Sequence, residues 1–195
     1  MPRLFTALEI PPDIALHLSM LRGGLPGARW IDPENYHITL RFIGDIDGRT
    51  ADEVAEALSR VERAPIELRL RGLDAFGGNK PHSLFAGIDA GPALNELQGE
   101  LERRMQRIGL KAEGRRFTPH VTLARLRNVK GFDVANYLSL RGNFSTMPFT
   151  AERFVLFSSK DSVGGGPYII EETYPLAGQK GGERRGEALK QAALS

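Results

Sequence analysis

The chain has 195 residues, of which 41% are hydrophobic and 26% charged, and a formal net charge of +2; these are the proportions of an ordinary soluble globular protein. It contains no cysteine, which excludes disulfide bonds, a thiol nucleophile and a thiolate metal site. No apolar run is long enough to span a membrane, and the N-terminus lacks the apolar core of a signal peptide, so we expect a cytoplasmic protein that does not bind membranes.

Strands and helices alternate in the first half of the chain. Two prolines after the first apolar run predict the start of a helix. Thr50, with Glu53 three residues later, predicts the N-cap of the second helix. The elements expected here are strands over residues 4–10, 36–43 and 66–73 and helices over residues 11–22 and 50–63.

The second half of the chain has a similar order, followed by a polar segment. Leu94, Leu97, Leu101 and Met105 recur at helical spacing and predict an amphipathic helix. The segment 178–195 is polar, and we expect it to be a loosely ordered tail. The elements expected before it are helices over residues 92–108 and 132–138 and strands over residues 84–89, 120–126, 149–157 and 168–174.

A short motif occurs once in each half, at an interval of 83 residues. It reads HITL from His37 in the first half and HVTL from His120 in the second. Because side chains alternate along a strand, the histidine and threonine of each copy share one face, and the apolar residues anchor the other. Two such strands facing across a cleft would place two imidazoles and two hydroxyls around one small anionic group.

The same interval of 83 residues separates the strands that start at Ile66 and Phe149. Such an internal repeat predicts two halves, about 1–83 and 84–177, related by an approximate two-fold axis. We expect an α+β fold of two pseudo-symmetric lobes, each an antiparallel sheet backed by helices, with the active site in a central groove. The two lobes together would form one domain over residues 1–177.

Both motifs resemble those of the 2H phosphoesterase superfamily. The flanking phrases, YHITLRFIGD from Tyr36 and RFTPHVTLAR from Arg116, are similar to those of its RNA 2′,3′-cyclic phosphodiesterase branch, long called 2′-5′ RNA ligases. The resemblance covers residues 1–177. It implies an enzyme that hydrolyses the terminal 2′,3′-cyclic phosphate of RNA to a 2′-phosphate. It also implies reversible 2′-5′ joining of RNA halves, such as tRNA halves, with a 5′-hydroxyl in place of water.

The residues of the two motifs suit this chemistry. Opening a cyclic phosphodiester requires a base that activates water and an acid that protonates the leaving alkoxide, and histidine can do either near neutral pH. The resemblance implies that His37 is the proton donor and His120 the proton acceptor. Thr39 and Thr122 would donate hydrogen bonds to the non-bridging oxygens. His-x-Thr is not metal-ligand spacing, and no third histidine, cysteine or paired carboxylate accompanies the motifs, so we expect no metal or other cofactor.

Arg125 corresponds to a substrate-contacting arginine that follows the second motif in this family. Simple alternation places Arg125 on the strand face opposite His120, so it needs a bulge or a bend to reach the cleft. An exposed arginine at the end of a strand is the alternative interpretation.

Four further residues are weaker candidates for the substrate site. Arg115 and Arg116 lie on the basic loop before the second motif, where they would contact RNA phosphates or form a solvated charge cluster. Phe42 and Phe117 would stack on a terminal base or pack in the core.

Two other functions remain open. A phosphodiesterase of the same superfamily could act on a small nucleotide, such as an ADP-ribose cyclic phosphate. A module that binds RNA ends without turnover fits the sequence less well, because pure binding does not require a paired acid and base. We expect a monomer whose partner is RNA, and we expect the remaining histidines, His17 and His82, to be surface residues.

Overall fold

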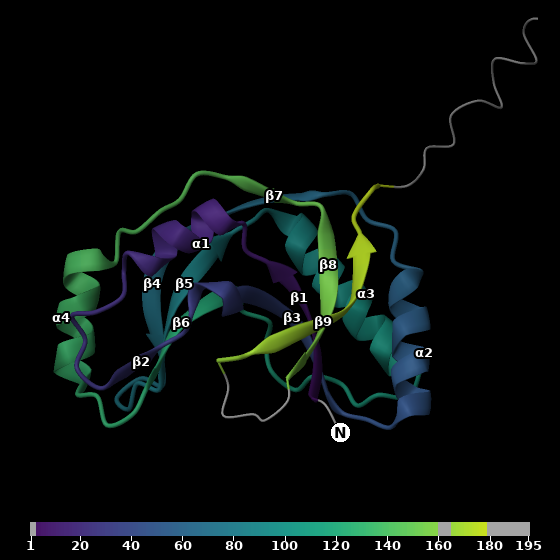
Figure 1. Cartoon of the computed structure of the whole chain (residues 1–195), viewed down its shortest axis with the longest axis horizontal. Helices are drawn as coiled ribbons and strands as arrows, with labels where there is room; N and C mark the ends of the chain where they lie inside the picture. The colour runs from purple at the N-terminus through teal and green to yellow at the C-terminus, as the bar shows by residue number, and fades with distance from the viewer. Residues whose placement is uncertain (1–2, 160–164, 179–195) are drawn as a thin grey trace, which may run out of the picture.

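One curled antiparallel sheet runs through the protein and is accompanied by helices (Figure 1). The computed structural model describes residues 3–159 and 165–178, and so the predicted tail lies, apart from Gly178, outside the described residues. The elements are β1 (Arg3–Glu9), α1 (Pro12–Ser19), β2 (Ala28–Trp30), the 3-10 helix η1 (Pro33–Asn35), β3 (His37–Asp45), α2 (Gly48–Ser59), β4 (Ile66–Phe76), β5 (Ser83–Asp89), α3 (Pro92–Arg107), β6 (His120–Leu126), α4 (Gly131–Arg141), β7 (Phe149–Ala151), β8 (Arg153–Ser159) and β9 (Tyr168–Pro175). These elements confirm the predicted α+β class.

The sheet consists of two lobes that meet at the motif strands. The strand order is β7-β4-β5-β6-β3-β1-β8-β9, and the short strand β2 pairs with β6. The only register pair between β3 and β6 is Ile38 with Val121. These two residues are 83 positions apart and pair antiparallel, as an approximate two-fold axis between the strands requires. The predicted pseudo-symmetry of the lobes is therefore confirmed.

Each lobe draws strands from both halves of the chain. The strand β4 of the first half pairs with β5, whereas β8 of the second half pairs with β1. The single strand predicted over residues 149–157 is consequently two strands that part at Glu152. Its first piece pairs with β4 in one lobe and its second piece with β1 in the other. The segment crosses from lobe to lobe, as Figure 1 shows.

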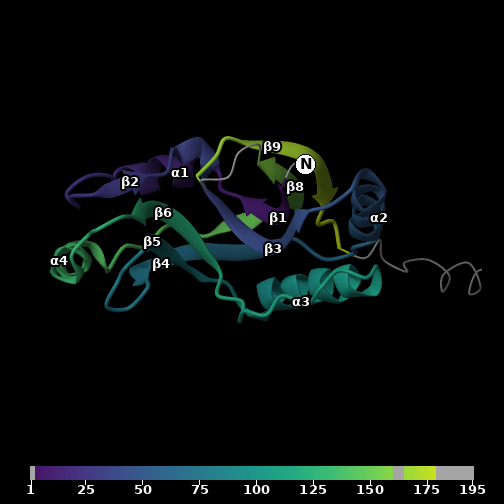
Figure 2. The same cartoon turned by 90° about the horizontal axis from the view of Figure 1, so that it is seen from below.

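The helices cover the sheet with their apolar stripes. Figure 2 shows α3 lying along the sheet below β3. The predicted stripe of α3 is fully buried, which agrees with its helical spacing; it consists of Leu94, Leu97, Leu101 and Met105. None of the described helices has both the length and the apolar character that a membrane crossing needs.

The second helix begins earlier than the sequence predicted. Its N-cap is Asp47, whose side chain accepts a hydrogen bond of 2.8 Å from the backbone nitrogen of Thr50. The prediction that Thr50 is the cap was wrong, because Asp47, two residues after β3, caps the helix and binds the amide of Thr50, one of the free amides of the first turn. Glu53 does not complete a capping box but binds Arg49, with 3.3 Å between Nε and Oε1.

Candidate active site

A cavity of about 740 Å³ lies over the junction of the two motif strands. This volume is in the range of small-molecule sites in proteins. All the residues that the sequence predicted for the site line it: His37, Thr39, Phe42, Arg116, Phe117, His120, Thr122 and Arg125. Arg115 also lines it. The repeat therefore brings residues from both halves of the chain into one cavity.

The two histidines are held in the same way. The Nδ1 atom of His37 lies 2.8 Å from the backbone oxygen of Asn35, and the Nδ1 atom of His120 lies 2.7 Å from that of Thr118. These carbonyls are themselves 83 positions apart. A carbonyl oxygen can only accept a hydrogen bond, so Nδ1 of each ring must carry the hydrogen. Nε2 of each imidazole is thus the nitrogen left to accept or donate a proton in the cavity.

Aromatic rings surround both imidazoles. The ring of His37 lies 5.1 Å from Phe5 and 4.9 Å from Tyr168, measured between centroids. The ring of His120 lies 4.9 Å from Phe76. Such neighbours remove water from the imidazoles and disfavour their charged forms.

The pKa values of both histidines are lowered accordingly. Burial lowers the pKa of His37 to about 4; the hydrogen bond to Asn35 opposes this effect, and the charges of His120 and Arg125 add to it. Burial also lowers the pKa of His120, with the Thr118 carbonyl opposing and Arg125 adding to the effect. Both imidazoles are therefore neutral at pH 7 in the free protein. A bound anion would raise both pKa values, because it favours the imidazolium forms.

A bulge in β6 brings Arg125 to the cavity. In the ladder between β5 and β6, Phe85 pairs with Thr122 but Leu84 pairs with Ala124, so the register skips Leu123. One skipped residue reverses the alternation beyond it. Arg125 consequently lines the cavity together with His120. This is the bulge that Arg125 needs in order to reach the cleft, and the sequence alone did not show whether it exists.

The first motif strand has a bulge at the equivalent place. In the ladder between β1 and β3, Ala7 pairs with Thr39 and Thr6 pairs with Arg41, so the register skips Leu40. Phe42 then lines the cavity and is 52% exposed. Phe42 and Arg125 are 83 positions apart and occupy equivalent places. An aromatic ring on one side and a cation on the other thus break the two-fold symmetry of the site.

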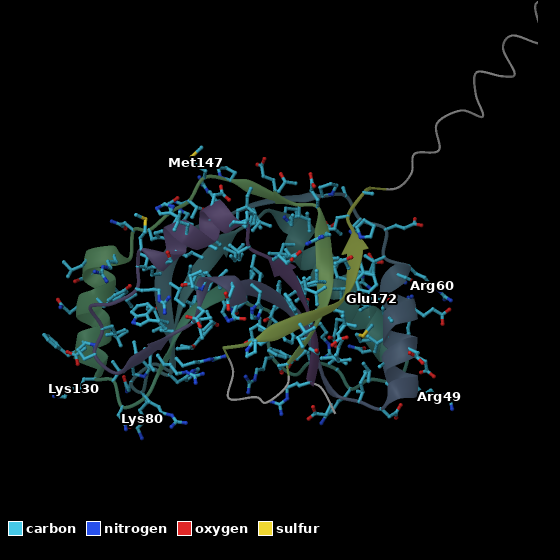
Figure 3. The ribbon with its side chains drawn as sticks, in the orientation of Figure 1. Arg49, Arg60, Lys80, Lys130, Met147 and Glu172 are labelled. Carbon is cyan, nitrogen blue, oxygen red and sulfur yellow. The ribbon has the colours of Figure 1, made fainter. Side chains whose placement is uncertain are left out.

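Three arginines at the cavity, Arg115, Arg116 and Arg125, differ from those on the outer helices. Arg49 and Arg60 point outward from α2 (Figure 3) and each pairs with a glutamate four residues away. Within the described part of the chain, no carboxylate pairs with Arg115, Arg116 or Arg125. Their charges are left to act on the cavity.

Removing the charge of Arg125 should raise the pKa of both cavity histidines, because that charge disfavours their protonated forms. We expect an NMR titration of the imidazole protons of the Arg125→Gln variant to show both transitions at higher pH than in the native protein. The matched control is Arg153→Gln, since Arg153 binds Glu9 outside the cavity with 2.7 Å between Nε and Oε2. Unchanged histidine titrations in Arg125→Gln would show that this charge does not reach the imidazoles.

Sequence reasoning missed several residues of the cavity wall. Phe5, Phe76 and Tyr168 come from strands remote from the motifs, and no local pattern marks them. His82 is exposed, as predicted, but it also lines the cavity and stacks on Phe76 at 6.4 Å and 19°. Arg41 is buried at the edge of the cavity, although a charged residue in a strand usually indicates a solvent-facing position.

Two other aromatic residues belong to the core. Trp30 packs on Tyr137 with 6.0 Å between ring centroids, and Tyr36 is buried. Among residues 3–159 and 165–178, no three histidine, aspartate or glutamate side chains gather in a way that could hold a metal ion.

Comparison with known proteins gives one family and closely agreeing names. A family model described as LigT like phosphoesterase matches residues 8–85 and 88–168. A protein of Aeropyrum pernix named RNA 2′,3′-cyclic phosphodiesterase is 35% identical over 114 residues, which is 57% of this chain and 64% of that protein. A protein of Geobacillus stearothermophilus with the same name is 36% identical over 128 residues, 62% of this chain and 41% of that protein. The chain thus spans less than two thirds of the length of each.

The fold also matches solved structures. The crystal structure of E. coli LigT complexed with 3′-AMP has a TM-score of 0.76 and 22% sequence identity, and the match covers 90% of this chain and 99% of that one. The two-lobed sheet with its central groove is therefore the fold of that protein.

Proposed function

The chain belongs to the LigT-like phosphoesterase family of the 2H superfamily, and we propose that it hydrolyses the 2′,3′-cyclic phosphate at the end of an RNA chain to a 2′-phosphate. The observation that carries this proposal is the pair of imidazoles, each fixed through Nδ1 and each presenting Nε2 to one cavity. The names of the Aeropyrum and Geobacillus relatives support the choice of an RNA cyclic phosphate as the substrate.

The hydrolysis requires one proton to be removed and one to be supplied. Nε2 of His120 accepts a proton from water, and the water oxygen bonds to phosphorus. The bond from phosphorus to the 3′ oxygen breaks, and protonated Nε2 of His37 gives its proton to that oxygen. The negative charge of the phosphate helps to protonate His37, whose pKa in the free protein is about 4. When the 5′-hydroxyl of a second RNA end takes the place of water, its oxygen bonds to phosphorus, the same 3′ oxygen leaves, and the two ends are joined by a 2′-5′ linkage.

The other cavity residues stabilise and orient the reacting phosphate. Thr39 and Thr122, on the faces of the two histidines, donate hydrogen bonds to its non-bridging oxygens as charge develops. Arg125 supplies a positive charge next to them. Phe42, the exposed ring at the equivalent place in the other lobe, offers a stacking surface to the terminal base. Arg116 and Phe117 extend the site along the loop that precedes β6.

The product identifies the reaction. A short RNA with a 2′,3′-cyclic phosphate end, incubated with the protein, should give a 2′-monophosphate. EDTA should not prevent the reaction, because histidine, threonine and arginine side chains stabilise the negative charge of the transition state. A 3′-monophosphate would instead exchange the roles of the two histidines. Binding without turnover would support the RNA-end binding module. Turnover that EDTA abolishes and one divalent metal restores would contradict the metal-free reaction.

Arg115 and Arg116 predict a difference between long and short substrates. If they contact RNA phosphates, affinity for an oligonucleotide should fall more steeply with salt than affinity for a cyclic mononucleotide, because each contact releases counterions. Binding measured between about 50 and 200 mM salt checks this expectation. Equal salt slopes would favour a small nucleotide as the substrate. The crystal structure of E. coli LigT complexed with 3′-AMP supports this second candidate function, a phosphodiesterase that acts on a small nucleotide.

A further inference from the structure

The basic loop between α3 and β6 forms one wall of the cavity. Its residues that line the cavity are Glu113, Arg115, Arg116, Phe117 and Thr118. The segment has no regular secondary structure, and both arginines are exposed. A loop of this kind adopts one position only if specific contacts fix it.

A largely buried ion pair between Arg41 of β3 and Glu102 of α3, whose side chain is 17% exposed, fixes the first part of this loop. Arg41 is only 6% exposed, and its guanidinium donates hydrogen bonds to the Glu102 carboxylate and to the backbone oxygen of Lys111. The Glu102 carboxylate in turn accepts a hydrogen bond of 3.0 Å from the backbone nitrogen of Glu113. Each partner of the ion pair therefore also binds the backbone of the loop.

Glu102 is well suited to hold this position in its charged form. Burial raises its pKa, but hydrogen bonds from Gln106, the Glu113 backbone and Arg41 outweigh that effect and lower the pKa below its usual value. Charge-assisted hydrogen bonds of this type are stronger than those between neutral groups.

The second part of the loop is fixed in another way. Phe117 packs against the core, and the backbone oxygen of Thr118 binds Nδ1 of His120. In the described part of the chain, the hydrogen bonds that hold the stretch 111–114 are those of the Lys111 backbone oxygen with Arg41 and of the Glu113 backbone nitrogen with Glu102. Loss of the ion pair would therefore release the stretch that leads to Arg115 and Arg116, while His120 keeps its own partner.

Folding does not explain why this ion pair is buried. Replacing a buried ion pair by apolar residues of similar volume is often neutral or stabilising. Arg41 also stands in the bulge, two residues after Thr39. The pair thus connects three parts of the site: a motif strand, the helix α3 and the basic loop.

We propose that Arg41 and Glu102 are positioning residues, which hold the loop so that Arg115 and Arg116 meet the phosphates of the RNA chain beyond the reacting end. This inference rests on the proposed function for its substrate. In this view the ion pair takes no part in the reaction, but it makes the protein prefer an RNA chain to a single nucleotide as its substrate.

The Glu102→Ala variant tests the inference, with Glu100→Ala as the matched control. Glu100 lies on the same helix and has the same exposed fraction, 17%, but among the described residues its ion-pair partners are Arg63 and Arg104 rather than the loop. We expect trypsin to cleave after Lys111, Arg115 and Arg116 faster in Glu102→Ala than in the native protein and the control. We expect kcat/KM for an oligonucleotide to fall on the order of tenfold relative to that for a cyclic mononucleotide, in keeping with the loss of two phosphate contacts.

Two further variants separate positioning from folding. Arg41→Met combined with Glu102→Leu replaces the pair by apolar residues; it should remain folded and still lose the preference for the oligonucleotide. Removing Arg115 and Arg116 in the Glu102→Ala background should reduce that preference little further, because released arginines no longer contact the chain.

The results distinguish this inference from the proposed function. If neither substrate is turned over by the native protein, the function fails, but faster cleavage of the loop still supports its anchoring by the ion pair. If Glu102→Ala leaves both the cleavage rate and the ratio of the two substrates unchanged, the inference is wrong. An equal loss for both substrates would also overturn it, since a general loss of folding affects them alike.

Discussion

The His37→Ala and His120→Ala substitutions should each lower kcat by about 10²- to 10⁴-fold, the usual contribution of a positioned acid or base. The imidazoles are equivalent in geometry, since each is fixed by the carbonyl two residues before it. Because the acid and the base act in the same transition state, the double variant should be far less impaired than the product of the two losses. Steady-state rates with a cyclic mononucleotide measure both effects.

Both single variants should remain folded. The residues that anchor the motif strands in the core lie on the strand faces opposite the histidines, so the substitutions leave their burial unchanged. These residues are Ile38, Leu40, Val121 and Leu123. His17→Ala is the control, because His17 lies on the exposed side of α1 and contacts Phe144 rather than the cavity. Near-normal turnover by His37→Ala, with none by His120→Ala, would replace the paired mechanism by one with a single base.

Thr39→Val and Thr122→Val should have the next largest effects. Valine keeps the shape of threonine but cannot donate a hydrogen bond, and loss of one donor to a developing oxyanion costs about 2.7–4 kcal/mol. The loss should appear in kcat rather than in KM, because the hydroxyls act on charge that forms in the transition state.

The conservative change to serine provides the control for each threonine. Thr39→Ser and Thr122→Ser retain the hydroxyl and should keep most of the activity that the valine variants lose. If valine and serine reduced the rate equally, packing of the γ-methyl group and not the hydroxyl would explain the effect.

The local pattern of the sequence was sufficient to predict which residues face the cavity up to each bulge. Alternation placed His120 and Thr122 correctly, and the interval of 83 residues predicted that Ile38 and Val121 occupy equivalent places. Their pairing across the two-fold axis agrees with that prediction. Such features depend on neighbours in the chain and on the repeat, both of which the sequence displays.

Beyond the bulges the sequence could not decide, because a bulge depends on the register with a strand that is distant in the chain. The skipped residue Leu123 is defined by pairing with β5, and only that register turns Arg125 toward the cavity. The exchange of β4 and β8 between lobes is likewise a property of the whole sheet. The single strand predicted over residues 149–157 was wrong for this reason.

The electrostatics of the site were also outside the reach of sequence reasoning. Histidine normally titrates near neutrality, and the sequence predicts no more than that. The lowered pKa of His37 arises from rings such as Phe5 and Tyr168, which belong to the strands β1 and β9 at opposite ends of the chain.

The pH dependence of kcat/KM tests most directly whether the two histidines act as an acid and base pair. For the native protein we predict a bell, since this ratio reports the free enzyme. Both limbs should lie below about pH 6.5, because both histidine pKa values are lowered from that value. His37→Ala should retain only the limb that rises with pH, and His120→Ala only the limb that falls. A complete bell that persists in either variant would contradict the paired mechanism.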